Sequence, residues 1–160
     1  MSTEFTHLNS SGDARMVNVA GKEITTRTAT ASGRVSVSPE VIALLRGGGV
    51  PKGDALAVAR IAGIQAAKRT PDLVPLCHPI AIHGVDISLI VNDDHVAIES
   101  TVTTADRTGV EMEALTVVSV AALALVDMVK AVDPAAVISD IKVLEKTGGK
   151  TGLWNRPADR

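Results

Sequence analysis

The chain has 160 residues, of which 46% are apolar, and a formal net charge of -2 with its four histidines neutral. This length suits a single domain with its own core, and the charge gives no basic field that would recruit nucleic acid. One cysteine excludes a disulfide within the chain. The polar start lacks the apolar segment of a secretory signal, so we expect a cytoplasmic protein.

The first part of the chain predicts an arm followed by β-structure. Residues 1–14 are rich in Ser, Thr and Asn without periodicity, which indicates a mobile N-terminal arm. Residues 15–38 mix Val, Ile and Thr with small polar residues, as strands do. We therefore expect one domain over residues 15–146, with a flexible basic tail over residues 147–160.

Two helices are expected next. Ser38 and the proline after it predict a helix over residues 39–46, because Ser is a good N-cap and Pro suits the first turn. Asp54 predicts the start of a second helix, which Pro71 ends. Small residues recur at every fourth position of this second helix and allow a neighbour to pack very close: Ala55, Ala59 and Gly63.

Lys52 precedes the second helix, where free backbone N–H groups and the helix dipole favour an anion. Four cationic side chains against one carboxylate make residues 50–70 a local basic patch. Lys52 is therefore either part of a phosphate site or a solvated loop lysine. Both interpretations fit the sequence.

A loop with prolines at positions 71, 75 and 79 carries Cys77 and His78. Proline restricts the backbone, so this loop can fix a side chain without regular structure. Adjacent Cys and His are weak evidence for a metal, because tetrahedral zinc needs about four ligands and the chain has no second Cys. We expect neither a metal nor a cofactor.

Alternating apolar residues predict a hairpin over residues 81–102, and residues 137–144 predict a last strand. The resulting order of elements is that of the split βαβ arrangement in ferredoxin-like folds. The fold class is therefore α+β, with an antiparallel sheet and helices on one face. We expect aliphatic residues on the other face to meet another layer or another subunit, so a homo-oligomer is predicted.

Residues 109–132 predict one long helix whose centre, residues 114–126, carries no charge. The uncharged run is shorter than the ~20 residues of a membrane span, so it belongs to a core or a subunit interface. Glu113 and Asp127 lie within ~40° of one face but ~21 Å apart along the axis. Either a long ligand lies along the helix, or a neighbouring chain completes a site at each end.

Asp127 and Lys130 are spaced i, i+3 on this helix and can touch. An ordinary surface ion pair is the simpler interpretation.

The tail sequence KTGGKTG lacks the first glycine of a phosphate-binding P-loop. What remains is a basic loop in which Lys146 and Lys150 can reach an anion.

Long stretches of the chain resemble the family of cyclic pyranopterin monophosphate synthases, the molybdenum cofactor biosynthesis protein C family. The resemblance covers residues 6–152 and rests on KGDALAVARIAGIQAAKRTPDLVPLCHPI, TGVEMEALTVVSVAALALVDMVKAV and KTGGKTG. The opening THLNSSGDARMVNVAGK is also similar, although Asn18 and Ala20 stand where the family pattern has Asp and Ser.

This resemblance implies a ferredoxin-like subunit in a hexamer, a trimer of dimers, with active sites at subunit interfaces. It also implies a lyase that converts (8S)-3',8-cyclo-7,8-dihydroguanosine 5'-triphosphate into cyclic pyranopterin monophosphate and diphosphate.

The resemblance further assigns roles to single residues. Asp127 matches the acid/base aspartate and Lys130 its partner. Lys52 and Lys146 match lysines associated with catalysis and phosphate binding, and Lys150 is a further candidate for the departing diphosphate. The remaining substrate contacts are Leu76, Cys77, His78, Met112 and Glu113.

Two other functions compete with the synthase. Ferredoxin-like oligomers also serve as sensors of small ligands, and fold alone does not set function. A sensor would bind a nucleotide without turnover. A purine-nucleotide cyclohydrolase is the second alternative, and a zinc assay would separate it from the synthase.

Overall fold

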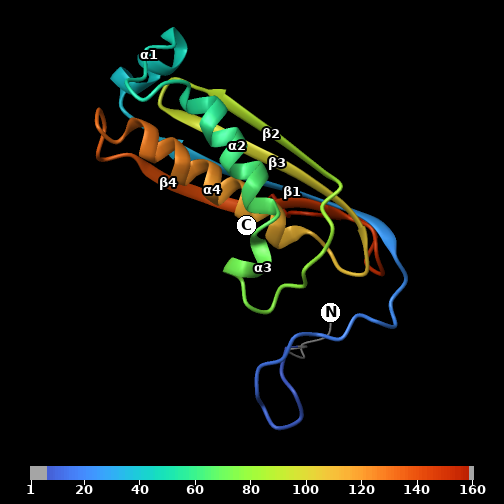
Figure 1. Cartoon of the computed structure of the whole chain (residues 1–160). Coiled ribbons are helices and arrows are strands. Elements are labelled where there is room, and N and C mark those ends of the chain that lie inside the picture. Colours follow the sequence, from blue (N-terminus) through green and yellow to red (C-terminus); the bar gives the residue numbers. More distant parts are fainter. Residues whose placement is uncertain (1–6, 159–160) are drawn as a thin grey trace.

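The computed structural model describes residues 7–158, which form a five-stranded antiparallel sheet with helices packed on one face (Figure 1). The strand order is β2-β3-β1-β4-β5. The strands are β1 (Thr25–Ser36), β2 (Gly84–Val91), β3 (His95–Asp106), β4 (Val137–Thr147) and β5 (Trp154–Asn155). The first four strands have the ferredoxin-like order, so the expected fold class is confirmed.

Two of the four helices within residues 7–158 begin where the capping residues Ser38 and Asp54 predict, whereas Pro71, expected to end the second helix, lies in the first turn of a separate short helix. The helices are α1 (Pro39–Gly47), α2 (Ala55–Ala67), α3 (Thr70–Leu73) and α4 (Glu111–Val129). The Ser38 hydroxyl accepts from the Val41 N–H at 3.4 Å, and the Asp54 carboxylate accepts from the Ala57 N–H at 3.0 Å. The short strand β5, which pairs with the end of β4, lies within the segment expected as a tail.

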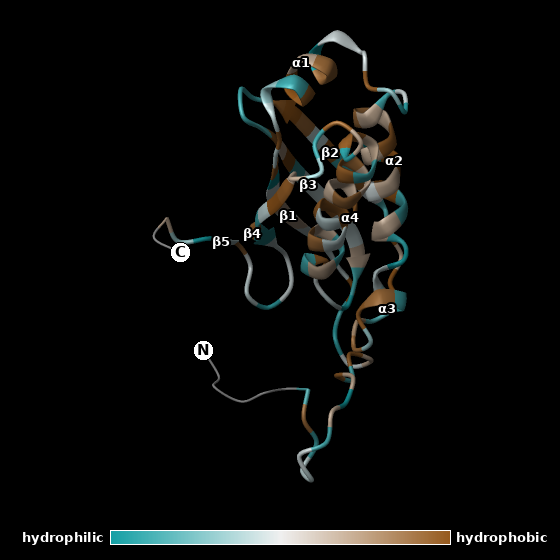
Figure 2. Ribbon diagram, turned by 90° about the vertical axis from the view of Figure 1, so that its left-hand side faces the viewer, coloured by the Kyte–Doolittle hydropathy of each residue, from teal (hydrophilic) through white to brown (hydrophobic). Residues whose placement is uncertain are grey.

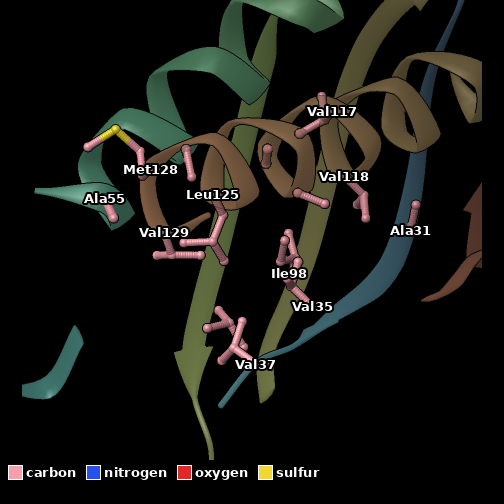
Figure 3. Close-up of a cluster of buried hydrophobic side chains, with 14 of the residues drawn as sticks. Ala31, Val35, Val37, Ala55, Ile98, Val117, Val118, Leu125, Met128 and Val129 are labelled. Atoms are coloured by element: carbon pink, nitrogen blue, oxygen red, sulfur yellow. The ribbon is translucent and has the colours of Figure 1, made fainter. Parts of the chain in front are cut away.

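The core lies between α4 and the sheet, with α2 beside α4 (Figures 1 and 3). Small residues bring these layers close together. A Cβ on Gly33 of β1 would lie 2.7 Å from Val118 of α4, and one on Gly63 of α2 would lie 2.8 Å from Ile87 of β2. Such distances are too short for carbon atoms, so a larger residue at either position would force the neighbouring side chains to shift.

Among the described residues, α4 is the only helix long and apolar enough to cross a membrane. Of its most apolar 18-residue window, 56% is buried against the rest of the chain. Leu125 and Val117 are fully buried. The helix is therefore a core helix, as the length of its uncharged run predicts.

The prediction of an aliphatic outer sheet face is wrong. In β1, Ala29 and Ala31 are buried toward the helices, so the alternation of the strand turns Thr30 and Arg34 to the other side. The hydroxyl of Thr30 bonds that of Thr101 across the strands at 2.9 Å. A polar face of this kind needs no cover.

Exposed apolar side chains gather instead on the outer side of the two long helices, where Figure 2 shows hydrophobic segments along α2 and α4. Ile61 of α2 is 65% exposed and Leu123 of α4 is 59% exposed. Val58 of α2 is exposed as well. The surface that lacks a partner in the protomer is therefore the helical one.

Candidate active site

A cavity of about 600 Å³ lies at the N-terminal end of α4. The start of α4, the proline-rich loop after α3, the end of β4 and the N-terminal segment surround it. Six residues singled out from the sequence line it: Leu76, Cys77, His78, Met112, Glu113 and Lys146. Segments that are far apart in the chain therefore meet around one space of ligand size.

His78 joins this loop to the N-terminal segment. Its Nε2 lies 2.6 Å from the carbonyl oxygen of Val17. A carbonyl oxygen can only accept, so Nε2 carries the proton and, in the neutral ring, Nδ1 is the acceptor. Val17 lines the same cavity. The N-terminal segment around Val17 thus forms one wall of the site, and the hydrogen bond from His78 joins it to the proline-rich loop.

The surroundings of Glu113 and Cys77 raise the pKa of both side chains. Glu113 is only 3% exposed, and burial raises the pKa of its carboxyl group, with a smaller contribution from the negative charge of Glu111. Burial also raises the pKa of the Cys77 thiol, and the charge of Glu113 adds to the effect. A protonated thiol is a poor nucleophile, so Cys77 is suited to contact rather than attack.

Lys146 extends from β4 toward the first turn of α4. Its Nζ donates to Oε1 of Glu111 at 2.7 Å, and both side chains are about one-third exposed. Glu111 also lines the cavity, although the sequence did not single it out.

Lys150 lies outside the main cavity and lines two neighbouring hollows of about 60 and 470 Å³ together with Arg27. The glycines before Lys150 make room for the arginine. Gly149 has a φ of +68°, and a Cβ there would lie 2.3 Å from the Arg27 guanidinium. The loop after β4 therefore fits closely around a cation of β1.

A second cluster stands at the C-terminal end of α4. Lys130 donates to Asp127 Oδ1 at 2.6 Å. Lys52 donates to Asp127 Oδ2 at 3.2 Å and to its backbone carbonyl at 2.8 Å. The three side chains are all about half exposed. Lys52 is thus part of this trio rather than an isolated loop lysine.

The environment of Asp127 lowers the pKa of its carboxyl group. Hydrogen bonds from Lys130 and then Lys52 are the main cause, and the charges of the two lysines add to it. The apolar run of α4 has little opposing effect, because Asp127 lies at the exposed end of the helix. In the protomer Asp127 is ionised at neutral pH, so it can accept a proton.

The two clusters are separated by the length of α4. Met112 and Glu113 lie in its first turn and Asp127 in its last, about 21 Å away at 1.5 Å per residue. One protomer therefore does not bring Asp127 to the cavity that holds Cys77 and His78.

The chain also matches known proteins along nearly all of its length. The model of the MoaC family matches residues 16–149. The chain belongs to the MoaC family. The matched range contains every site candidate named above except Lys150, which lies one residue beyond it.

Three relatives of this MoaC-family chain illustrate the similarity. A cyclic pyranopterin monophosphate synthase of Streptomyces avermitilis is 68% identical over 95% of this chain and 89% of its own. A cyclic pyranopterin monophosphate synthase 2 of Mycobacterium tuberculosis is 57% identical, over 97% and 93%. A cyclic pyranopterin monophosphate synthase of Peptoclostridium acidaminophilum is 52% identical, over 96% and 98%.

The departure from the MoaC-family pattern near the N-terminus has a local structural account. Asn18 Oδ1 accepts from the Ala20 N–H at 2.9 Å, which is a turn that an aspartate makes in the same way. The flanking residues Val17 and Val19 line the cavity. The asparagine therefore keeps the turn that presents them.

The sequence alone did not find Glu111 or Arg27. Glu111 pairs with a lysine 35 positions later, and Arg27 lies in a Thr-rich strand that the tail reaches only in the folded chain. Within residues 7–158, no group of three His, Cys, Asp or Glu side chains is arranged to hold a metal ion.

Proposed function

We propose that this protein is a lyase of molybdenum cofactor biosynthesis. It converts (8S)-3',8-cyclo-7,8-dihydroguanosine 5'-triphosphate into cyclic pyranopterin monophosphate and diphosphate, and it acts in the cytoplasm. Membership of the MoaC family and the names of its relatives support the reaction. The observation that carries it is the single cavity in which the loop of Cys77 and His78 meets Glu113 and Lys146.

The phosphate chemistry calls for cations. A hydroxyl oxygen of the substrate forms a bond to the α-phosphorus, and the bond from that phosphorus to the bridging oxygen of the β-phosphate breaks. Diphosphate leaves with the electron pair and its added negative charge. Lys146 in the cavity, with Arg27 and Lys150 beside it, can stabilise this charge electrostatically.

The purine chemistry calls for proton transfer. Opening the five-membered ring and closing the pyran ring move several protons at neutral pH, and a positioned acid or base accelerates each transfer. Burial shifts Glu113 and Cys77 toward their protonated forms, in which each can donate a hydrogen bond. Asp127, ionised beside Lys130 and Lys52, is the base.

A complete site requires a second protomer, because Asp127 lies ~21 Å from the cavity in its own chain. The midpoint between Met112 and Asp127 along α4 falls between Ser119 and Val120. A two-fold axis through this point would lay the α4 helices of two protomers antiparallel, with Asp127 of each beside Met112 of the other. The exposed Leu123 and Ile61 would be covered in such a pair. We propose that three of these dimers form a hexamer.

The direct test is to incubate the purified protein with the cyclised dihydro-GTP and to follow diphosphate release and product mass. We expect stoichiometric diphosphate and a product with the mass of cyclic pyranopterin monophosphate. Binding of the substrate without turnover would instead support a nucleotide sensor.

A further inference from the structure

The ion pair of Lys146 and Glu111 stands between two hollows of the protein. Both residues, and Gly109 before them, line the cavity of about 600 Å³ and also the small hollow of about 60 Å³ that holds Arg27 and Lys150. The pair therefore forms the partition between the main cavity and a hollow that three cationic side chains line: Arg27, Lys146 and Lys150.

We propose that Glu111 is a positioning residue that fixes the Lys146 ammonium at this partition, in place for the bridging oxygen that leaves with diphosphate. This inference rests on the proposed function, in which Lys146 stabilises the leaving group. Glu111 acts through Lys146 and makes no contact of its own with the reacting atoms.

The two partners differ in how firmly they are held. A lysine side chain has a flexible four-carbon stem and loses rotamer entropy when it is fixed. Glu111 stands at the first residue of α4, where the helix dipole stabilises a carboxylate. The contact of 2.7 Å thus ties a flexible cation of β4 to a stable position on the helix.

Gly109 provides the space that the carboxylate occupies. A Cβ at Gly109 would lie 2.0 Å from Glu111 Oε2 and 2.9 Å from its Cδ. The φ of Gly109 is not positive, so its backbone would accept alanine. Because the atoms in the way are the end of a flexible side chain, a methyl group there would displace the carboxylate without disturbing the fold. Gly109→Ala therefore moves the negative charge without removing it.

The kinetic consequence follows from position rather than from net charge. A displaced Lys146 loses contact with the leaving oxygen in the transition state, so kcat should fall. Substrate binding should be kept, because Arg27 and Lys150 still face the phosphates and one carboxylate near them is removed or moved away. We expect kcat to drop about 10-fold, within the range that small misplacements cause, with KM unchanged or lower.

The test compares Glu111→Gln and Gly109→Ala with Glu99→Gln, in the full-length protein, by diphosphate release. Glu99 is an exposed carboxylate on the uncovered sheet face, so its variant should match the unmodified protein. Both test variants should show the fall in kcat. A change in KM alone, or no change in kcat, would overturn the proposal.

Double variants locate the effect. In a Lys146→Ala background, Glu111→Gln should cause no further loss, because there is no ammonium left to position. In a Glu111→Ala background, Gly109→Ala should likewise have no effect, because the carboxylate it displaces is absent. The same 10-fold loss in either background would contradict the role of Glu111.

Failure of the proposed function can be told apart from failure of this inference. If neither the unmodified protein nor Glu99→Gln releases diphosphate, the reaction itself is wrong. The ion pair of Lys146 with Glu111 is then tested by the NMR signal of the Lys146 side chain. That signal is assigned by its absence in Lys146→Arg. That signal should shift in Glu111→Gln and in Gly109→Ala, and an unchanged signal in both would overturn the positioning role.

Discussion

The two ends of α4 carry carboxylates whose surroundings push their pKa values in opposite directions. At the first turn, Glu113 is buried beside a cavity and its pKa is raised. At the last turn, Asp127 is exposed between two lysines and its pKa is lowered. Environment, not residue type, separates an acid from a base. The acid end lines a cavity of about 600 Å³, while the carboxylate at the base end is 57% exposed.

Asp127→Asn should have the largest effect on activity. The amide cannot accept a proton, so diphosphate release should fall about 10²- to 10⁴-fold, the usual contribution of a general base. Asp93→Asn is the matched control, because Asp93 forms an exposed ion pair of its own, with Arg46 at 2.9 Å. If Asp127→Asn lost only stability and kept its rate, Asp127 and Lys130 would be a structural pair.

A charge on the outer side of α4 should dissociate the proposed dimer. Asp127 of one protomer would then no longer lie beside the cavity of the other. Leu123→Glu places a carboxylate in the proposed two-fold interface, where an unpaired charge is costly to bury. We expect a lower solution mass and activity reduced to a few per cent or less, on the order of the loss of a catalytic residue. Ile90→Glu alters an equally exposed residue on the polar sheet face and should retain the dimer and its activity. Dimers that survive Leu123→Glu would place the interface elsewhere.

Mixed oligomers test whether the two ends come from different chains. His78→Ala and Lys130→Ala should each be nearly inactive alone. After mixing and reassembly, random pairing makes half of the dimers mixed, each with one intact site, so activity should return to about one quarter of normal. The readout is diphosphate release before and after exchange of subunits. No recovery, with exchange verified by mass, would mean that each chain carries a whole site.

The smallest effect concerns stability at the acid end. Burial raises the pKa of Glu113 in the folded state above its value in the unfolded state. The contribution of the Glu113 carboxyl group to stability is therefore fully present below the unfolded-state pKa. It is lost as pH rises through the folded-state pKa. Glu113→Gln cannot ionise, so its urea midpoint should fall less with rising pH in that window than the midpoint of the unmodified protein. Glu99→Gln should follow the unmodified curve. Parallel curves for Glu113→Gln would show that Glu113 ionises freely.

Much of the fold could be predicted because its signals are local. The caps Ser38 and Asp54, the alternating hairpin and the uncharged run of α4 each specify one element within a few residues. The outer sheet face could not be predicted, since β1 alternates Ala with Thr and has no large apolar side chain before Val35 that would mark its inner face. Only the packed helices decide which of the two points inward.

The candidate site was predictable to the extent that it resembles a family, and much less so from spacing. The i, i+3 contact of Asp127 with Lys130 follows from helix geometry. The contact of Lys52 with Asp127, 75 positions away, and that of Lys146 with Glu111 depend on how the elements pack. No periodicity in the sequence encodes such pairs.

The fastening of the N-terminal segment through the carbonyl of Val17 has a consequence for sequence change. The imidazole of His78 donates to a backbone carbonyl oxygen, which any amino acid at position 17 would supply. Substitutions at positions 17 to 20 can therefore change the lining of the cavity while the hydrogen bond between His78 and the backbone is kept. In this short stretch the fit of the substrate can change without loss of the contact that holds the segment. His78 cannot be substituted in the same way, because its side chain supplies the donor.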